Sequence, residues 1–181
     1  MNKTLITVIQ EKNREKLILY EINEKERRKI FETQAFIGKN GITNSKVEGD
    51  GKTPEGLFKL GIAFGTHDIK EMNKDIEYIE INENLYWVDD VKSKYYNKLV
   101  DITKVRKDWN TAEHLIEYPK QYEYAIEIKS NIDNIPNRGS AIFLHCSINS
   151  PTSGCVAIER NKMLEIFKRL NQDTRIFIQA I

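Results

Sequence analysis

The chain has 181 residues, which is enough for one domain with a substantial hydrophobic core. Its 28 lysines and arginines nearly balance its 27 aspartates and glutamates, so no overall field attracts nucleic acid or an anionic membrane. Charged residues make up 30% of the sequence and aromatic residues 9%, a composition typical of a folded, soluble protein. Two cysteines are too few for a disulfide framework.

No targeting segment is visible in the sequence. The apolar run 4–9 is too short to span a membrane, and it lacks the small-residue cleavage site of a signal peptide. Two interpretations stay open: a cytoplasmic protein, or a numbering that begins after a removed leader.

The first half of the chain predicts strands and one long loop. Apolar runs at 4–10 and 17–22, separated by a polar stretch, predict a β-hairpin. Residues 38–56 are rich in glycine and lack apolar periodicity, which indicates a long structured loop of a kind that is often functional. Weak alternation at 57–64 predicts a strand. Residues 86–101 carry aromatic side chains without regular spacing, and we interpret them as irregular structure.

The second half predicts three strands and one helix. Alternation at 122–128 predicts a half-buried strand, and the nearly continuous apolar run 140–146 predicts a strand buried on both faces. The residues from Met163 to Leu170 have apolar side chains at helical spacing, and Asn161 is a candidate N-cap. The last strand is expected at 174–181. The pattern indicates one mainly β domain with a few helices.

Both cysteines and one of three histidines fall between His145 and Cys155. Because side chains alternate along a strand, Cys146 is expected to face away from His145 and to pack beside Leu144. Cys155 follows Pro-Thr-Ser-Gly, a tight turn whose backbone N–H groups can converge on one point. A cysteine there, with His145 as its base, fits a known design of nucleophile. On spacing alone, a structural buried cysteine is an equal alternative.

Two other interpretations of this segment are weighed. A zinc site of His145, Cys146 and Cys155 lacks the usual short cysteine spacing and a fourth ligand, so we expect no metal. A disulfide between the two cysteines is conceivable.

The turn Thr152-Ser153-Gly154-Cys155, with His145 before it, resembles the motif of the L,D-transpeptidase (YkuD-like) catalytic domain family. Further segments are similar to one branch of that family: GKNG (38–41), EGDGKTPEGLF (48–58), AFGT (63–66), WVDDVKSKYYNKLVD (87–101), AEHL (112–115) and RGSAIFLH (138–145). The resemblance implies a single catalytic domain over residues 1–181 with a mainly β, β-sandwich-like fold.

The resemblance also implies an activity. Cys155 would attack the carbonyl of an L-D peptide bond in a peptidoglycan stem peptide, release terminal D-alanine and pass the acyl group from a thioester to an amine or to water. His145 would be general base and then acid, oriented by the backbone carbonyl of Cys146. Amides around Gly154 and Cys155 would form the oxyanion hole, and Ser153 belongs to the same turn. No cofactor is implied, and carbapenem β-lactams are the expected inhibitors.

Two departures from the family pattern concern the substrate. Ala157 stands where the family motif commonly has an arginine, and the spacing from histidine to cysteine is shorter than in many members. The cation that holds the substrate carboxylates could then be Arg138, otherwise a solvated loop charge, or His114, otherwise a structural histidine in a helical turn beside Glu113.

Other residues are candidates for the cleft. Thr152 and Trp87 are expected to contact the substrate, although Trp87 could equally be a core anchor. Asp89 and Asp90 either line the cleft or form a turn, and His67 is expected at the surface.

Three functions are carried forward. The first is a cell-wall transpeptidase, the second a hydrolase of the same bond or of a covalent wall attachment, and the third a non-catalytic wall-binding module with an inert Cys155. Both His145 and Gly154 are present, which disfavours the third. Because the substrate lies outside the cytoplasmic membrane, we expect an extracytoplasmic location, with an export signal encoded ahead of this segment. We expect a monomer.

Overall fold

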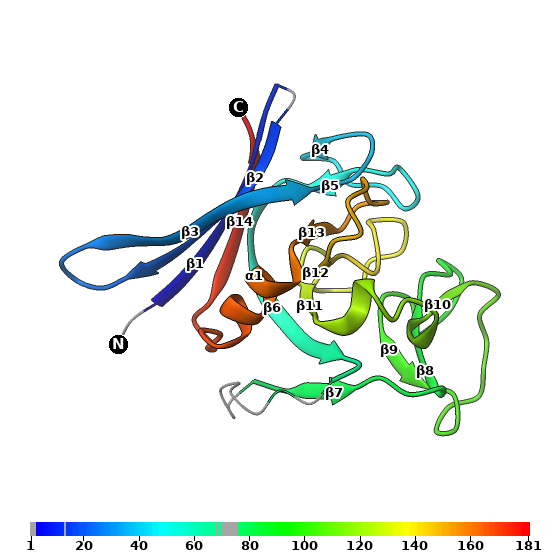
Figure 1. The fold of residues 1–181 in the computed structure, drawn as a ribbon. Helices are drawn as coiled ribbons and strands as arrows, with labels where there is room; N and C mark the ends of the chain where they lie inside the picture. Colours follow the sequence, from blue (N-terminus) through cyan, green and yellow to red (C-terminus); the bar gives the residue numbers. More distant parts are fainter. Residues whose placement is uncertain (1–2, 13, 68, 70–75) are drawn as a thin grey trace.

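A long sheet dominates the computed structural model, which describes residues 3–12, 14–67, 69 and 76–181 (Figure 1). Within these residues the sheet has the strand order β11-β12-β13-β3-β2-β1-β14-β6-β7. In chain order its strands are β1 (Lys3–Glu11), β2 (Arg14–Ile22), β3 (Arg27–Phe36), β6 (Gly56–Gly65), β7 (Tyr78–Glu80), β11 (Ala125–Ile128), β12 (Phe143–Cys146), β13 (Val156–Ile158) and β14 (Arg175–Ala180).

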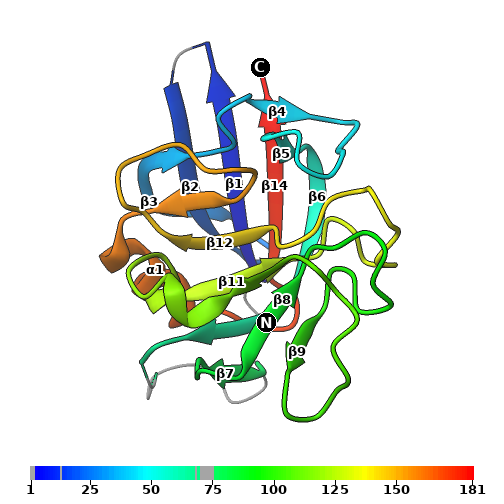
Figure 2. The same ribbon diagram turned by 90° about the vertical axis from the view of Figure 1, so that its right-hand side faces the viewer.

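The sheet folds back on itself because β6 pairs twice. The first part of β6 pairs with β14, and its second part, from Leu60 to Phe64, pairs with β11. Strand β3 also connects the two parts of the sheet, because it pairs with β2 up to Gln34 and with β13 at Ala35 and Phe36. The strongly curved β6 is plain in both views (Figures 1 and 2). The expected mainly β, sandwich-like fold is confirmed.

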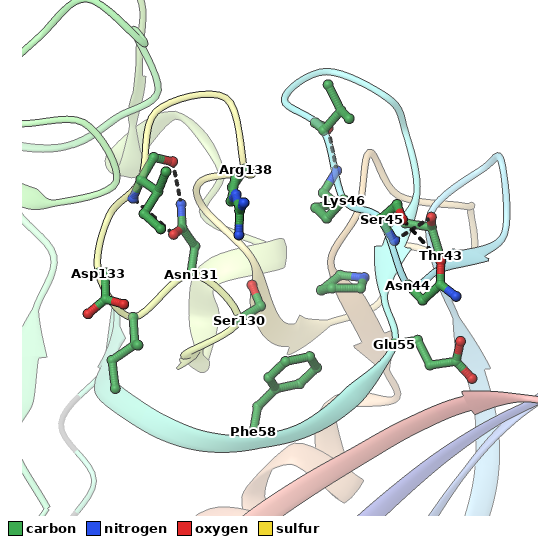
Figure 3. A pocket seen from close by; sticks show the side chains of 14 residues that line it. Thr43, Asn44, Ser45, Lys46, Glu55, Phe58, Ser130, Asn131, Asp133 and Arg138 are labelled. Carbon is green, nitrogen blue, oxygen red and sulfur yellow. Dashed lines mark hydrogen bonds between the residues drawn. The ribbon is translucent and has the colours of Figure 1, made fainter.

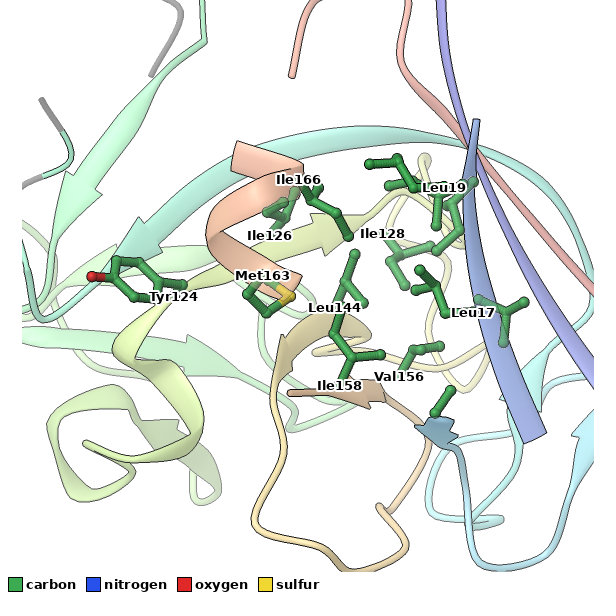
Figure 4. Packing of buried hydrophobic residues seen from close by; sticks show 14 of the residues in the cluster. Leu17, Leu19, Tyr124, Ile126, Ile128, Leu144, Val156, Ile158, Met163 and Ile166 are labelled. Carbon is green, nitrogen blue, oxygen red and sulfur yellow. The ribbon is translucent and has the colours of Figure 1, made fainter. Parts of the chain in front are cut away.

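The main hydrophobic core lies inside the folded sheet, and helix α1 (Arg160–Phe167) packs against it (Figure 4). Met163, Ile166 and Phe167 are fully buried, so the predicted amphipathic helix is confirmed. Its predicted start is wrong: Glu159 is the N-cap residue, and Asn161 lies inside the helix. The chain passes from strand β13 almost directly into the helix, so the N-cap lies two residues earlier than the predicted Asn161.

Several predicted strands are confirmed. The runs at 4–10 and 17–22 form the antiparallel hairpin β1–β2, 57–64 lies in β6, and 174–181 contains β14. The 140–146 prediction is confirmed for β12, in which every residue is buried. Strand β3 had no prediction, because its sequence is charged and most of its side chains are exposed or half-buried.

Strand β11 differs from the half-buried strand predicted at 122–128. It starts only at Ala125, after the 3-10 helix η2 (Gln121–Glu123), and all its residues are buried. The reason is its position between β12 and β6, which covers both edges, with core on both faces.

The prediction of irregular structure at 86–101 is confirmed for residues 89–98, which form turns and coil, and is wrong at both ends of the segment. The segment contains β8 (Leu85–Val88) and β9 (Leu99–Asp101), which join β10 (Ala112–His114) in a sheet of order β10-β8-β9. These strands are held by buried side chains of Trp87, Val88 and Val100, a packing that local spacing does not reveal. His114 ends β10 rather than sitting in a helical turn, and the 3-10 helix η1 (Leu115–Glu117) follows it.

The loop predicted at 38–56 contains only two short parallel strands, β4 (Ile42–Thr43) and β5 (Thr53–Pro54). In the part of the chain that the structure describes, no helix has the length and apolar character needed to cross a membrane.

Candidate active site

His145 and Cys155 are brought together by two adjacent parallel strands. His145 lies in β12 opposite Ala157 of β13, and Cys155 immediately precedes β13. Both residues line one pocket with a volume of about 220 Å³. Glu113, Tyr118, Tyr122 and Ser153 are among the other residues of the lining, together with Thr152 and Ala157.

The two cysteines occupy different environments. Cys146 packs in the main core with Ile142 and Leu144, whereas Cys155 packs in a second cluster with Phe143. The alternation expected along β12 is therefore confirmed, and both cysteines are free rather than disulfide-bonded. Among the described residues, no group of three or more His, Cys, Asp or Glu side chains is placed to hold a metal ion.

His145 is a buried and oriented imidazole, with 7% of its surface exposed. Its Nδ1–H donates to the backbone carbonyl of Cys146 at 2.8 Å. Because a carbonyl oxygen only accepts, Nδ1 carries the proton and Nε2 keeps its lone pair. Burial lowers the pKa of His145 to about 4, so the ring is neutral at pH 7. A neutral ring with a free Nε2 can accept a proton.

The thiol of Cys155 is held by backbone groups. Its Sγ accepts from the Phe143 N–H at 3.3 Å and donates to the Ala141 carbonyl at 3.2 Å. Burial and then the charge of Glu113 raise its pKa to about 12. No hydrogen bond between the described atoms joins Sγ to the His145 ring, so the unliganded site pairs a protonated thiol with a neutral imidazole.

Thr152 builds the turn that carries Cys155. Its Oγ1 accepts from the Gly154 N–H at 3.1 Å and donates to the Cys155 carbonyl at 2.7 Å. Its backbone forms a parallel bridge with Gly38. The Thr152 hydroxyl is therefore occupied within the turn, although the residue lines the pocket.

The long 38–56 loop holds the same turn in place through hydrogen bonds of Thr53. The Thr53 hydroxyl donates to the Gly154 carbonyl at 2.8 Å and accepts from the Gly38 N–H at 2.8 Å. Gly154 has a φ of +150°, and a Cβ there would lie 3.0 Å from the backbone oxygen of Lys52. Only glycine fits this position without strain.

The structure does not bring the predicted substrate cations to this pocket. Arg138 lines a separate cavity of about 490 Å³ together with Lys46 and Phe58 (Figure 3). Both ring nitrogens of His114 have partners, the Glu83 carbonyl at 2.9 Å and the Glu117 carboxylate at 3.1 Å.

Trp87 and the neighbouring aspartates are also away from the pocket lining. Trp87 is 1% exposed, and its Nε1–H donates to the Asn97 side chain at 3.1 Å, as expected of a core anchor. Asp90 accepts from the backbone N–H groups of Lys92 and Asn110, as a turn former does. His67 is at the surface, as predicted.

Sequence reasoning missed three functional candidates in the pocket: Glu113, Tyr118 and Tyr122. The Tyr122 hydroxyl donates to the Glu113 carboxylate, and the ring of Tyr122 meets His145 edge-on. Burial, with added repulsion from Asp89 and Glu48, raises the pKa of Glu113 to about 7. The alternation at 122–128 predicts that Tyr122 is buried, but nothing in the local sequence predicts that Glu113 shares a pocket with Cys155.

Lys46 is a further missed residue near the turn. Its side chain is 9% exposed and forms an ion pair with Asp50. Its Nζ lies 3.6 Å from the place that a Cβ on Gly154 would take, and its charge lowers the pKa of Cys155. Of the two cations that line the Arg138 cavity, it is the nearer to Gly154.

Comparison with solved structures supports the fold. The chain is similar to the helical cell shape determining protein Pgp2 from Campylobacter jejuni, with a TM-score of 0.54 and 18% identity over 98% of this chain. The K307A mutant of Pgp2 matches with a TM-score of 0.52 and 19% identity over 98% of this chain. The chain spans about half (48%) of the Pgp2 structure, and at this identity the likeness shows the fold alone.

Comparison with sequences identifies the family. No curated protein matches the chain. The family profile of YkuD, described as the L,D-transpeptidase catalytic domain, matches residues 4–178 and so covers the strands, the pocket and the Cys155 turn. The chain belongs to the L,D-transpeptidase (YkuD) catalytic domain family.

Proposed function

We propose that the chain is a cysteine acyltransferase that cleaves the L-D peptide bond before the terminal D-alanine of peptidoglycan stem peptides. The observation that carries the proposal is the convergence of Cys155 and His145 on one pocket, with Nδ1 of His145 tied to a backbone carbonyl. A proton acceptor and a thiol therefore line the same pocket, which is the pairing that a cysteine nucleophile needs.

In the first step the thiol of Cys155 loses its proton during its attack on the substrate and not before. Nε2 of His145 takes the proton of Cys155 while Sγ forms a bond to the carbonyl carbon of the diamino acid. The carbonyl electrons move to oxygen, and an oxyanion forms. When the oxyanion collapses, the C–N bond breaks, the leaving nitrogen takes the proton from His145, and D-alanine departs from a thioester.

The oxyanion needs donors at the turn. The Gly154 N–H already donates to Thr152, so we assign the donor role chiefly to the N–H of Cys155, with Gly154 and Ser153 shaping the turn. In the second step an acceptor attacks the thioester, gives its proton to His145, and the thiolate leaves and recovers that proton.

Two acceptors are compatible with this site. An amine of a second stem peptide gives cross-linking, and water gives a trimmed stem peptide. Because peptidoglycan lies outside the cytoplasmic membrane, we propose that the reaction takes place there. The cell-shape name of Pgp2 suggests a role in wall geometry for this chain too.

The decisive experiment uses stem tetrapeptides that contain lysine or diaminopimelate and end in D-alanine. Wild type is expected to release D-alanine, Cys155→Ala to release none, and Cys146→Ala to act like wild type. Mass spectrometry then identifies the second product as tripeptide or cross-linked peptide. No release by folded wild type from either peptide would overturn the proposal.

A second measurement uses a carbapenem as probe. Its strained amide should acylate Cys155, giving one adduct on wild type and on Cys146→Ala but none on Cys155→Ala, measured by intact-protein mass spectrometry. An adduct that persists on Cys155→Ala would show that Cys155 is not the nucleophile.

A further inference from the structure

The pocket beside Cys155 carries a charge opposite to the one that the family motif supplies. Ala157, at the position of the usual arginine, lines the pocket, and none of the described residues in the lining is a lysine or arginine. The lining does include the carboxylate of Glu113. A pocket of this kind suits a cationic group rather than a carboxylate.

The Glu113 carboxylate has capacity for a ligand. Among the described residues, only Tyr122 donates a hydrogen bond to it, and a carboxylate can accept several. Behind it, Oδ1 of Asp89 is buried and has no hydrogen-bond partner within the described part of the chain. The charges of Asp89 and Glu48 both act on Glu113. Burial and these two charges raise the pKa of Glu113 to about 7, and a bound cation would favour its ionised form.

We infer that Glu113 is a specificity-determining residue that binds the side-chain ammonium of the diamino acid whose carbonyl is attacked. This inference rests on the proposed function, in which that amino acid supplies the scissile carbonyl and so brings its side chain into the pocket. A charge-assisted hydrogen bond from the ammonium to Glu113 would fix the acyl group beside Sγ.

The same contact links binding to activation of the thiol. The negative charge of Glu113 is the second cause, after burial, of the raised pKa of Cys155, and it opposes formation of the thiolate. An ammonium bound at Glu113 offsets that repulsion. The thiol is thus more easily deprotonated when a substrate with a free amine is present than when the pocket holds only water.

Binding can be measured without turnover in the Cys155→Ala protein. The probes are the lysine tetrapeptide with a free side-chain amine and the same peptide with that amine acetylated, titrated by calorimetry. The free-amine peptide is expected to bind about tenfold tighter, as for one charge-assisted hydrogen bond. In Cys155→Ala/Glu113→Gln the ratio should approach one, because glutamine keeps an acceptor for Tyr122 but loses the charge.

Glu117→Gln is the matched control. Glu117 lies in the adjoining 3-10 helix, contacts His114 and is exposed, so its removal should leave the tenfold ratio unchanged. A ratio near one in Cys155→Ala, a ratio that Glu113→Gln does not change, or the absence of binding by both peptides would overturn the inference. Failure of the proposed function is seen separately, as the absence of D-alanine release by wild type.

Discussion

Tyr122 meets the imidazole of His145 edge-on, with ring centroids 5.6 Å apart and planes at 84°. The hydroxyl of the same tyrosine donates a hydrogen bond to Glu113, so one side chain contacts both His145, the proposed base, and the Glu113 carboxylate. With Nδ1 of His145 held by the Cys146 carbonyl, the ring of His145 is restrained from two directions. The packing of η2 therefore determines the position of the proton acceptor.

Because Tyr122 makes two contacts, we expect Tyr122→Phe and Tyr122→Leu to have different effects. Tyr122→Phe keeps the ring but removes the hydroxyl, so we expect unfolding in urea to show a loss of about 1–2 kcal/mol. The pKa of Glu113 should rise further, because the Tyr122 hydrogen bond lowers it. Tyr122→Leu also removes the ring contact and should reduce kcat for D-alanine release. Equal kcat values for the two variants would argue against a positioning role for the ring.

The turn at Gly154 predicts a strong effect of a single methyl group. Gly154→Ala combines a left-handed φ with a contact to the Lys52 backbone, and should destabilise the fold by about 1–3 kcal/mol and abolish D-alanine release. Gly49→Ala is the matched control, because Gly49 has a φ of +72° but nothing within 4 Å of an added Cβ. Gly49→Ala should cost only about 1 kcal/mol and leave kcat intact. Thermal unfolding and activity would be measured on both.

Two buried groups predict opposing pH dependences of stability. The pKa of His145 falls from 6.5 to about 4 on folding, so between these values the unfolded chain binds the extra proton and stability falls as pH falls. The pKa of Glu113 rises from 4.5 to about 7, so in that window the folded chain binds the extra proton and stability falls as pH rises. In wild type the two slopes largely cancel.

Single variants should reveal each slope. In Glu113→Gln, the free energy of unfolding should rise with pH from 4 to 6.5, by up to about 1.4 kcal/mol per pH unit. In His145→Asn it should fall with pH from 4.5 to 7. Urea unfolding at a series of pH values measures both. Parallel curves for wild type and both variants would contradict the assignment.

We expect Cys155 to react slowly with iodoacetamide, a general alkylating reagent, but to be modified by a carbapenem. Burial raises the pKa of Cys155 to about 12 and that of Cys146 to about 11, so both should react with iodoacetamide at pH 8 far more slowly than a free cysteine. A carbapenem, which provides an acyl group for His145-assisted attack, should still modify Cys155. Rapid alkylation of Cys155 by iodoacetamide would instead indicate a thiolate in the unliganded site.

Local pattern predicted much of the fold, and its failures have identifiable physical causes. Apolar runs located β1 and β2, and weak alternation located β6, because each of these strands packs side chains into the core. Strand β3 escaped because its first half is charged and exposed, and β8 and β9 because they depend on partners distant in sequence. Arg138 and His114 are candidate substrate cations because of their charge and their place in segments that resemble the family, whereas tertiary structure places Glu113 in the pocket instead.

The register between β12 and β13 has a consequence for the short spacing from His145 to Cys155. The pairs Leu144–Val156 and His145–Ala157 set where the base stands relative to the nucleophile, and the loop between them only has to close. Residues 147–150 of that loop are not part of any strand. We therefore expect an insertion near Asn149 to keep His145 opposite Ala157, and to act on the site only through the loop residues that line the pocket.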